Sequence, residues 1–482
     1  MSAVLIPLII PLTLALLSGF VKARHLFALN IFGSLLLLIS ALYLLFSVFD
    51  NEVLTVQFGA WPMPYGITFM ADGLSAVLII AIALVFLSVL LLMKGHKNWH
   101  EFADNSAHYQ FVLLQGLMAA SIAVTLTSDL FNLYVWFELI LMSVLGLLII
   151  RGKQQNFEAA IKYFTINMLG TLLMLSAVGF IYGISGQLNF EAVKQASLNE
   201  DLQPQMQIYS ALFVLALLMK VGAFPLFIWL PASYHTLPLP LLALIGGLLT
   251  KITAYVLLRL SGQVFDIEFM LDALGWLAVL TMLSGAIGAA YHWDLRRILA
   301  FHIVSQVGFL LLGIALASQA GAVGTTLFLV HNILVKTNLF LIAGAIFIAA
   351  KHYDLRKVGG LYPANILLAV LFLINAMALV GVPPTTGFWG KFLILQETIH
   401  QQHLVWAIAA LITGFLTLYS MSKIWQEVFW KKPLAEQGEI EIVPKTVMLP
   451  IISITVLVVL IGIYPDPIIA FLQHTFLGFY GG

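Results

Sequence analysis

The sequence predicts an all-α polytopic membrane protein with about 14 transmembrane helices. Hydrophobic residues fill 61% of the 482 positions and charged residues only 9%, and the mean hydropathy is +1.03. Soluble globular domains carry roughly 25% charged residues, so this composition excludes a soluble globule. Apolar windows of roughly 20 residues, the length that spans a hydrocarbon core, recur along the whole chain.

Each apolar window defines one expected helix. The polar connections between the windows are too short to fold alone, so a single transmembrane domain is expected over residues 1–482. The first window lacks a basic segment and a cleavage site, and is therefore expected to be a retained helix. The expected helices cover residues 3–20, 26–48, 68–93, 108–128, 130–150, 158–184, 207–230, 236–260, 269–290, 294–317, 321–350, 364–397, 403–430 and 446–475.

Basic residues gather on one side of the predicted membrane domain. Connections that follow odd-numbered helices, with their helix ends, hold 16 of the 22 Lys and Arg residues, whereas the opposite connections hold only Lys194 and Arg259. By the positive-inside rule, the basic connections face the cytoplasm and both termini face outward. The basic set is Lys22, Arg24, Lys94, Lys97, Arg151, Lys153, Lys162, Arg296, Arg297, Lys351, Arg356, Lys357, Lys423, Lys431, Lys432 and Lys445.

Composition excludes several classes of function. The formal net charge of +0 argues against nucleic-acid binding and against a polybasic surface role. The chain has no cysteine, so disulfides, thiolate nucleophiles and iron–sulfur ligation by this chain are excluded. We expect no cofactor and no bound metal, and the lipid bilayer as the surrounding medium.

A glutamate, Glu138, lies deep in the predicted fifth helix. It is about 12 Å from the start of that helix at ~1.5 Å per residue, near the middle of a ~30 Å hydrocarbon core. A carboxylate at this depth must be paired, protonated or wetted by a cavity. Two interpretations remain: a fixed ion pair between helices, or a carboxylate whose proton affinity a neighbouring lysine controls.

Four lysines also fall inside the predicted spans. Lys220, Lys251, Lys336 and Lys391 belong to the seventh, eighth, eleventh and twelfth helices. An ammonium at this depth costs at least ~2.5–3.5 kcal/mol, so it is expected to face a partner, a cavity or an ion path. A buried lysine can change protonation state when its partner moves, as a permanently charged arginine cannot. For Lys251 the alternative is a side chain that reaches the interface by snorkelling.

Two histidines accompany these lysines. His331 lies five residues before Lys336, and His302 lies in the central third of the tenth helix. Histidine titrates near neutral pH and can pass a proton between its two ring nitrogens, so both residues suit a relay. A hydrogen-bonded structural role is the alternative for each.

Two of the lysine-bearing helices are interrupted by proline. Pro225 follows Lys220, and the pair Pro383 and Pro384 precedes Lys391. Proline removes a helix hydrogen bond and frees a backbone carbonyl, and the resulting half-helix ends can direct dipoles into a cavity. Paired interrupted helices in the two halves of a chain are typical of inverted-repeat transporters.

Two further aspartates are expected near membrane entrances. Asp129 directly precedes the fifth helix and is expected to cap it. Asp72, in FMADGLS (69–75), is either an acid on the outer side or an ordinary interfacial carboxylate.

The chain resembles the antiporter-like subunits shared by Mrp-type Na⁺/H⁺ antiporters, respiratory complex I and membrane-bound hydrogenases. The likeness covers nearly the whole length and lies in LYVWFELILM, KVGAFPLFIWLP, LPLPLLALIGGLLTKITAY, LRRILAFHIVSQVG and VGVPPTTGFWGKF. It implies inverted repeats of helices four to eight and nine to thirteen. The implied divisions are 1–107, 108–260, 269–430 and 446–482.

Within this family the chain is most similar to Mrp D subunits, to judge from AFHIVSQVG, HNILVKTNLFLIAG and the lysine at position 391. The resemblance implies a bacterial plasma-membrane protein that works with other membrane subunits in a Na⁺/H⁺ antiporter. It also implies functional roles for Glu138, Lys220, Lys251, Lys336 and Lys391. The alternatives are a proton-translocating subunit of complex I or a hydrogenase, and a scaffold without an ion path. Because the interior holds more lysine than carboxylate, we expect protons to follow this chain and Na⁺ to pass elsewhere in the complex.

Overall fold

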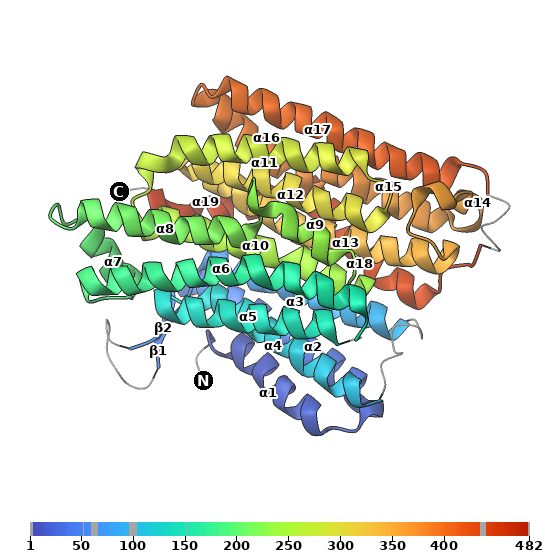
Figure 1. Cartoon of the computed structure of the whole chain (residues 1–482), viewed down its shortest axis with the longest axis horizontal. Coiled ribbons are helices and arrows are strands. Elements are labelled where there is room, and N and C mark those ends of the chain that lie inside the picture. Colours follow the sequence, from blue (N-terminus) through green and yellow to red (C-terminus); the bar gives the residue numbers. More distant parts are fainter. Residues whose placement is uncertain are drawn as a thin grey trace.

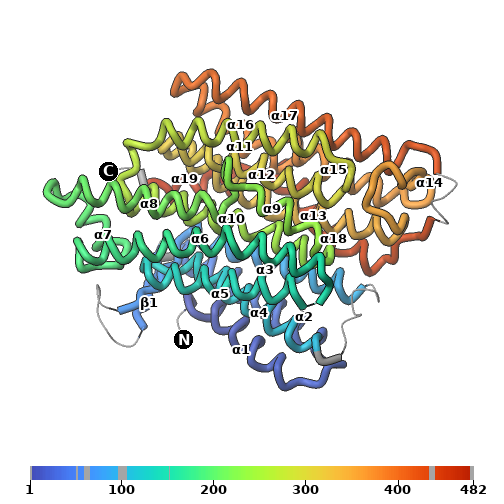
Figure 2. Tube along the Cα trace, in the orientation of Figure 1, coloured from blue at the N-terminus to red at the C-terminus, as the bar shows by residue number. Residues whose placement is uncertain are grey.

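The computed structural model describes residues 3–51, 53–58, 66–95, 104–150, 152–433 and 440–480. These residues form a bundle of long helices that run side by side (Figures 1 and 2). In this part of the chain, twelve helices are long and apolar enough to cross a membrane, and two apolar helices are shorter. The predicted fold class is therefore confirmed. Lys97 and Arg151 of the basic set lie outside the described residues.

The first three long segments are α1 (Ile6–Phe20), α2 (Ala23–Asn51) and α3 (Gly73–Gly95). A short antiparallel hairpin, β1 (Leu54–Gln57) with β2 (Thr68–Ala71), lies between α2 and α3. The sequence predicts a helix from residue 68, and this boundary is wrong because residues 68–71 pair with β1. Phe69 also bridges to Thr127, which ties β2 to the end of α4.

The remaining helices follow the predicted spans closely, with a few additions. The short α7 was not predicted, and the single helix expected over 446–475 is wrong because the chain breaks after Ile463 and resumes at Asp466. The elements are α4 (Asp104–Leu126), α5 (Leu130–Ile149), α6 (Gln154–Ser185), α7 (Phe190–Ser197), α8 (Gln203–Val221), η2 (Leu226–Ile228), α9 (Trp229–Tyr234), α10 (Leu239–Gln263), η3 (Glu268–Met270), α11 (Leu271–Tyr291), α12 (Leu295–Ala315), α13 (Gln319–Ala350), η4 (Leu355–Lys357), α14 (Leu361–Ala364), α15 (Ile366–Val380), α16 (Thr386–His400), α17 (Leu404–Trp425), η5 (Gln426–Trp430), α18 (Lys445–Ile463) and α19 (Asp466–Tyr480).

Both predicted helix interruptions are present, and they share one backbone pattern. α8 ends at Gly222 and α15 at Gly381, and both glycines have positive φ, +79° and +97°. A side chain is strained in that conformation, so glycine ends each helix. A cis peptide bond precedes Pro225 and Pro384, three residues after each glycine. The helix therefore stops at the glycine, ahead of the proline, and the division into repeats stays a prediction.

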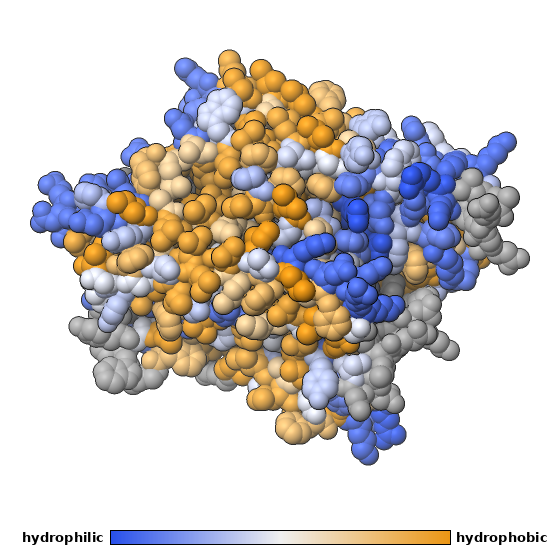
Figure 3. Space-filling view, viewed as in Figure 1, coloured by the Kyte–Doolittle hydropathy of each residue, from blue (hydrophilic) through white to orange (hydrophobic). Residues whose placement is uncertain are grey.

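Three helices form the centre of the bundle. α10, α12 and α13 are almost entirely buried by other parts of the chain, whereas α2, α6 and α17 expose broad apolar faces. Figure 3 shows this apolar surface as a belt, with hydrophilic residues gathered at its two ends. The central helices carry Lys251, His302, His331 and Lys336, so these side chains are shielded from the lipid.

The connections predicted to face the cytoplasm meet at one end of the bundle. Asp294, before α12, forms a β-bridge with Asp354, before η4. The Lys431 ammonium donates a hydrogen bond to the Arg356 carbonyl at 3.2 Å. We call this the basic end. α1 begins and α19 ends at the other end, on the left of Figure 1, and which end faces the cytoplasm stays a prediction.

Candidate functional site

Glu138 and Lys220 occupy neighbouring positions on α5 and α8. Asp129 caps α5 by accepting a hydrogen bond from the Asn132 backbone at 2.7 Å, so its predicted capping role is confirmed. Glu138 interacts electrostatically with Lys220, yet the described residues contain no ion pair to Glu138 within 4.0 Å. Its Oε1 is buried and has no hydrogen-bond partner among them. The geometry does not support a fixed ion pair at Glu138.

Lys220 lies where α5, α6 and α8 meet. Its Nζ donates a hydrogen bond to Thr171 Oγ1 at 2.7 Å and lies 5.3 Å from the centroid of the Phe137 ring. A small cavity of about 20 Å³ adjoins it, lined in part by Tyr163, Lys220, Trp229 and Thr253. This volume is enough for about one water molecule. Because Thr253 belongs to α10, the cavity reaches from Lys220 toward the helix of Lys251.

Lys251 is fully buried in α10. Its Nζ donates a hydrogen bond to the Gly246 carbonyl at 2.8 Å, within its own helix. The snorkelling alternative is therefore wrong, because the ammonium stays in the interior of the bundle.

Lys336 and the two histidines lie beyond Lys251, on α13 and α12. Lys336 Nζ is buried and has no hydrogen-bond partner in the described part of the chain. His331 Nδ1 lies 2.7 Å from Thr386 Oγ1 at the start of α16, and His302 Nε2 lies 2.8 Å from Ser420 Oγ on α17. In each histidine the other ring nitrogen is buried, and no described residue hydrogen-bonds to it.

Lys391 of α16 lies against the end of the interrupted helix α15. Its Nζ donates hydrogen bonds to the Leu379 and Val380 carbonyls at 2.9 and 3.0 Å. It also lies 4.5 Å from the centroid of the Phe309 ring. The last carbonyls of a helix carry partial negative charge and a ring face attracts cations, so this pocket suits an ammonium.

The break after α8 is held by different groups. Trp229 Nε1 donates a hydrogen bond to the Met219 carbonyl at 3.2 Å. The Phe224 N–H, just after the break, donates to Thr281 Oγ1 at 3.0 Å. The first break is thus held by neutral groups and the second by a lysine.

Unpartnered polar atoms concentrate on the three central helices. Nine buried side-chain N or O atoms on α10, α12 and α13 lack a hydrogen-bond partner among the described residues. Each such atom costs about 1–3 kcal/mol unless something satisfies it. The atoms belong to Thr250, His302, Ser305, Gln306, His331, Asn332, Lys336 and Asn338.

The seven predicted site residues interact electrostatically with one another in smaller groups. Lys336 interacts electrostatically with Lys251 and Lys391, and His331 interacts with Lys336 and Lys391. His302 interacts with Lys336 and Lys391. No hydrogen bond joins any two of the seven in the described structure, so the side chains form a spaced series rather than a contiguous chain.

Known proteins share both the sequence and the fold. Residues 127–417 match the family described as "NADH:quinone oxidoreductase/Mrp antiporter, TM". The chain is 34% identical over 438 residues to the D subunit of the Na⁺/H⁺ antiporter of Alkalihalophilus pseudofirmus, covering 90% of this chain and 87% of that protein. The chain belongs to the family of Mrp antiporter D subunits.

Solved structures share the fold of this chain. A chain of the Mrp complex from Dietzia sp. superimposes with a TM-score of 0.89 at 26% identity, over 99% of this chain and 97% of that one. A chain of respiratory complex I from Thermus thermophilus gives a TM-score of 0.82 at 23% identity, over 99% and 98%. The second likeness concerns the fold alone.

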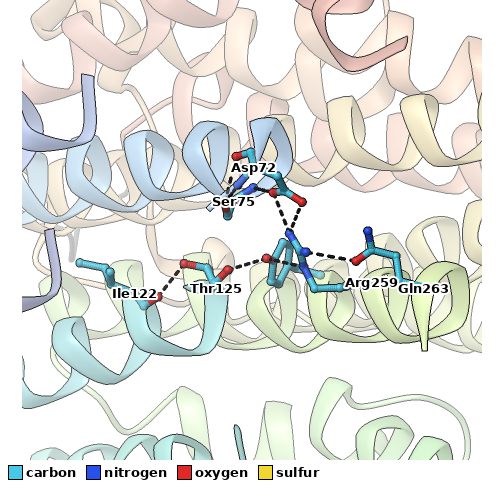
Figure 4. A network of polar contacts seen from close by, with 7 residues as sticks. Asp72, Ser75, Ile122, Thr125, Arg259 and Gln263 are labelled. Carbon is cyan, nitrogen blue, oxygen red and sulfur yellow. Dashed lines mark hydrogen bonds and ion pairs between the residues drawn. The ribbon is translucent and has the colours of Figure 1, made fainter. Parts of the chain in front are cut away.

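One buried ion pair of this Mrp D-subunit family member is not evident from the sequence. The Arg259 Nη2 of α10 lies 2.7 and 2.8 Å from the two carboxylate oxygens of Asp72, just before α3 (Figure 4). Arg259 Nε also donates to the Tyr255 hydroxyl, which donates to the Thr125 carbonyl of α4. Burial raises the pKa of Asp72, but the charge and hydrogen bonds of Arg259 outweigh burial and hold it below its usual value.

This network changes two sequence-based assignments. Arg259 lies inside α10 and is buried, although its position near the helix end predicts an interfacial residue. Asp72 is buried and paired with Arg259, so it is not an ordinary interfacial carboxylate. Both residues are charged and lie at the end of the bundle opposite the basic end, which is the sequence signal for a pair between them. They are 187 positions apart in the sequence, so no local pattern reveals their contact.

Proposed function

We propose that this chain is the proton-conducting D subunit of a multisubunit Na⁺/H⁺ antiporter in a bacterial membrane. Membership of the Mrp D-subunit family supports this, as do relatives named for that activity. Its partners are other membrane subunits of the same complex. Relatives above 30% identity are antiporter subunits, whereas the likeness to complex I concerns the fold, so we prefer this function to a redox-driven pump.

The proposed path runs through Glu138, Lys220, Lys251, His331 with Lys336, and Lys391, with His302 beside its second half. One observation carries this proposal: Lys220, Lys251, Lys336 and Lys391 are 6%, 0%, 0% and 6% exposed, and none is in salt-bridge contact with a carboxylate of the described residues. A permanently charged lysine in such surroundings would raise the free energy of the folded protein. A lysine that gives up its proton becomes neutral and avoids this cost. The unpartnered polar atoms of α10, α12 and α13 supply sites where water can bridge the gaps between these lysines.

Na⁺ takes another route in this proposal. The series contains four lysines and a single carboxylate, Glu138. Na⁺ is a hard cation that prefers several oxygen ligands, and lysines repel it. We therefore assign Na⁺ movement to other parts of the complex, coupled to the protonation states in this chain.

Lys336 offers the cleanest test of the proposed path. Its Nζ makes no hydrogen bond in the described structure, so Lys336→Met removes the titratable group without breaking a contact. The complex should assemble normally, while Na⁺-driven proton movement in everted vesicles should fall by about 100-fold or more. Purification through this chain should co-isolate the other antiporter subunits.

Full antiport in Lys336→Met would refute the path through this residue. As a matched control, Lys194→Met changes an exposed lysine of α7 far from the series and should leave the rate unchanged. Copurification with quinone- or hydrogen-oxidising subunits would instead support the redox-driven alternative.

A further inference from the structure

A large cavity opens at the basic end of the bundle. It measures about 530 Å³, far above the ~10–15 Å³ that one water molecule needs, and is lined by residues that include His235, His292, Asp294 and Arg297. It lies where the α9–α10 connection, the α11–α12 connection and η4 meet. Burial and then the charge of Arg297 lower the pKa of His235 and of His292, so neutral imidazoles face the cavity near pH 7. The cavity therefore brings water and the proton-accepting imidazoles of His235 and His292 together at the basic end.

Lys423 of α17 lies directly behind the wall of this cavity. Its Nζ donates hydrogen bonds to the Ala290 and His292 carbonyls, both at 2.7 Å, and lies 5.0 Å from the centroid of the Trp293 ring. His292 and Trp293 line the cavity. The side chain is only 9% exposed, although its position near the end of the span predicts a cytoplasmic surface residue. The Lys423 ammonium is thus bound to the backbone of the cavity wall.

The inward neighbour of Lys423 is the pair of Ser420 and His302. Ser420 lies three residues earlier on the same face of α17, and its Oγ is 2.8 Å from His302 Nε2. His302 is fully buried and interacts electrostatically with Lys336, Lys391 and Lys423. Of the seven residues in the series, His302 is therefore the one that connects to Lys423, through Ser420.

Capping of α11 accounts for only part of this arrangement. A lysine that donates to the last carbonyls of a helix stabilises the helix end, and Lys423 does so for α11. Capping does not require that the same lysine adjoin a buried serine–histidine pair, yet Ser420, one turn earlier on α17, lies 2.8 Å from His302.

We propose that Lys423 passes protons between the basic-end cavity and His302, and so connects the lysine series to water at this end. The inference rests on the proposed proton path. One proton moves at each step: from cavity water to the Lys423 amine, and from the resulting ammonium through the Ser420 hydroxyl to His302 Nε2. Ser420 receives one proton as it gives one, so it ends unchanged.

Two variants of the intact complex separate proton transfer from capping. Lys423→Arg keeps a cation with several donors for the Ala290 and His292 carbonyls, but arginine does not release its proton near neutral pH. Lys423→Met removes both properties. We expect both variants to lower Na⁺-driven proton movement in everted vesicles by about tenfold or more, with Lys423→Arg assembling at the level of the unaltered complex.

Activity near that of the unaltered complex in Lys423→Arg would overturn the inference and leave Lys423 as a helix cap. The matched control is Lys431→Arg, because Lys431 lies at the same end and pairs with Glu427 at 2.9 Å without lining the cavity. That variant should keep full activity. Failure of the proposed function is a separate result: it would appear as full antiport in Lys336→Met, whatever the Lys423 variants do.

Discussion

Replacing Lys220 with methionine is expected to lower Na⁺-driven proton movement by about 100-fold or more in vesicles that contain the assembled complex. Methionine has similar length and volume, so the packing against Phe137 is largely kept while the proton-binding group is lost. The effect should be large because Lys220 interacts electrostatically with Glu138 and also lines the small cavity that leads to α10. The measurement is the recovery of a pre-formed pH gradient after Na⁺ is added.

Thr171→Val provides the matched control for Lys220. It removes the hydroxyl that accepts the 2.7 Å hydrogen bond from Lys220 Nζ but leaves the amine in place. We expect it to lower the rate only severalfold. Equal losses in both variants would mean that the hydrogen bond, rather than the proton-binding group, matters. Substantial antiport in Lys220→Met would remove Lys220 from the path.

The second large effect is expected at the Asp72–Arg259 ion pair, and it concerns stability. Asp72→Ala removes the buried carboxylate that accepts two hydrogen bonds from the Arg259 guanidinium, a loss of about 3–5 kcal/mol. The purified complex should unfold at a clearly lower temperature. Replacing both residues, as Asp72→Asn with Arg259→Gln, removes both charges of the pair and should recover much of the loss. If the double variant were no more stable than Asp72→Ala, charge burial would not explain the effect.

An exposed ion pair supplies the comparison for Asp72. Asp354 and Arg356 also lie 2.7 Å apart, but their side chains are 27% and 65% exposed, against 5% and 4% for Asp72 and Arg259. Exposed pairs contribute about 0–1 kcal/mol, so Arg356→Ala should change stability little. The folded-state pKa of Asp72 is below its ordinary 3.8, so its contribution is full above that value and is lost as the pH falls through the folded-state pKa.

Local patterns in the sequence predicted the helices well. Apolar windows predicted the spans, and Pro225 with the pair Pro383 and Pro384 predicted both interruptions, although the helices end slightly earlier, at Gly222 and Gly381. The errors occurred where tertiary pairing overrides local preference. Residues 68–71 continue an apolar run, yet they form a strand because β1 offers hydrogen-bond partners to their backbone.

The site was only partly predictable, for a physical reason. Depth in a span identifies a costly charge, so Glu138 and the four buried lysines could be named from the sequence. The hydrogen-bond partners of the lysines and of the two histidines could not, because they are single hydroxyls or backbone carbonyls, most of them on another helix. Lys391 on the Leu379 carbonyl and His302 beside Ser420 are examples. The burial of Lys423 could not be predicted. The α11–α12 connection covers its helix end, and no periodicity in the sequence reveals that contact.

The two helix breaks are held by different groups: an indole at the first and a lysine amine at the second. At the first break an indole, whose charge never changes, holds the Met219 carbonyl. At the second break the carbonyl end of α15 is held by the amine of Lys391, whose attraction for those carbonyls weakens when it gives up its proton. In the proposed proton path, the end of α15 is therefore the place where loss of a proton would loosen a backbone contact.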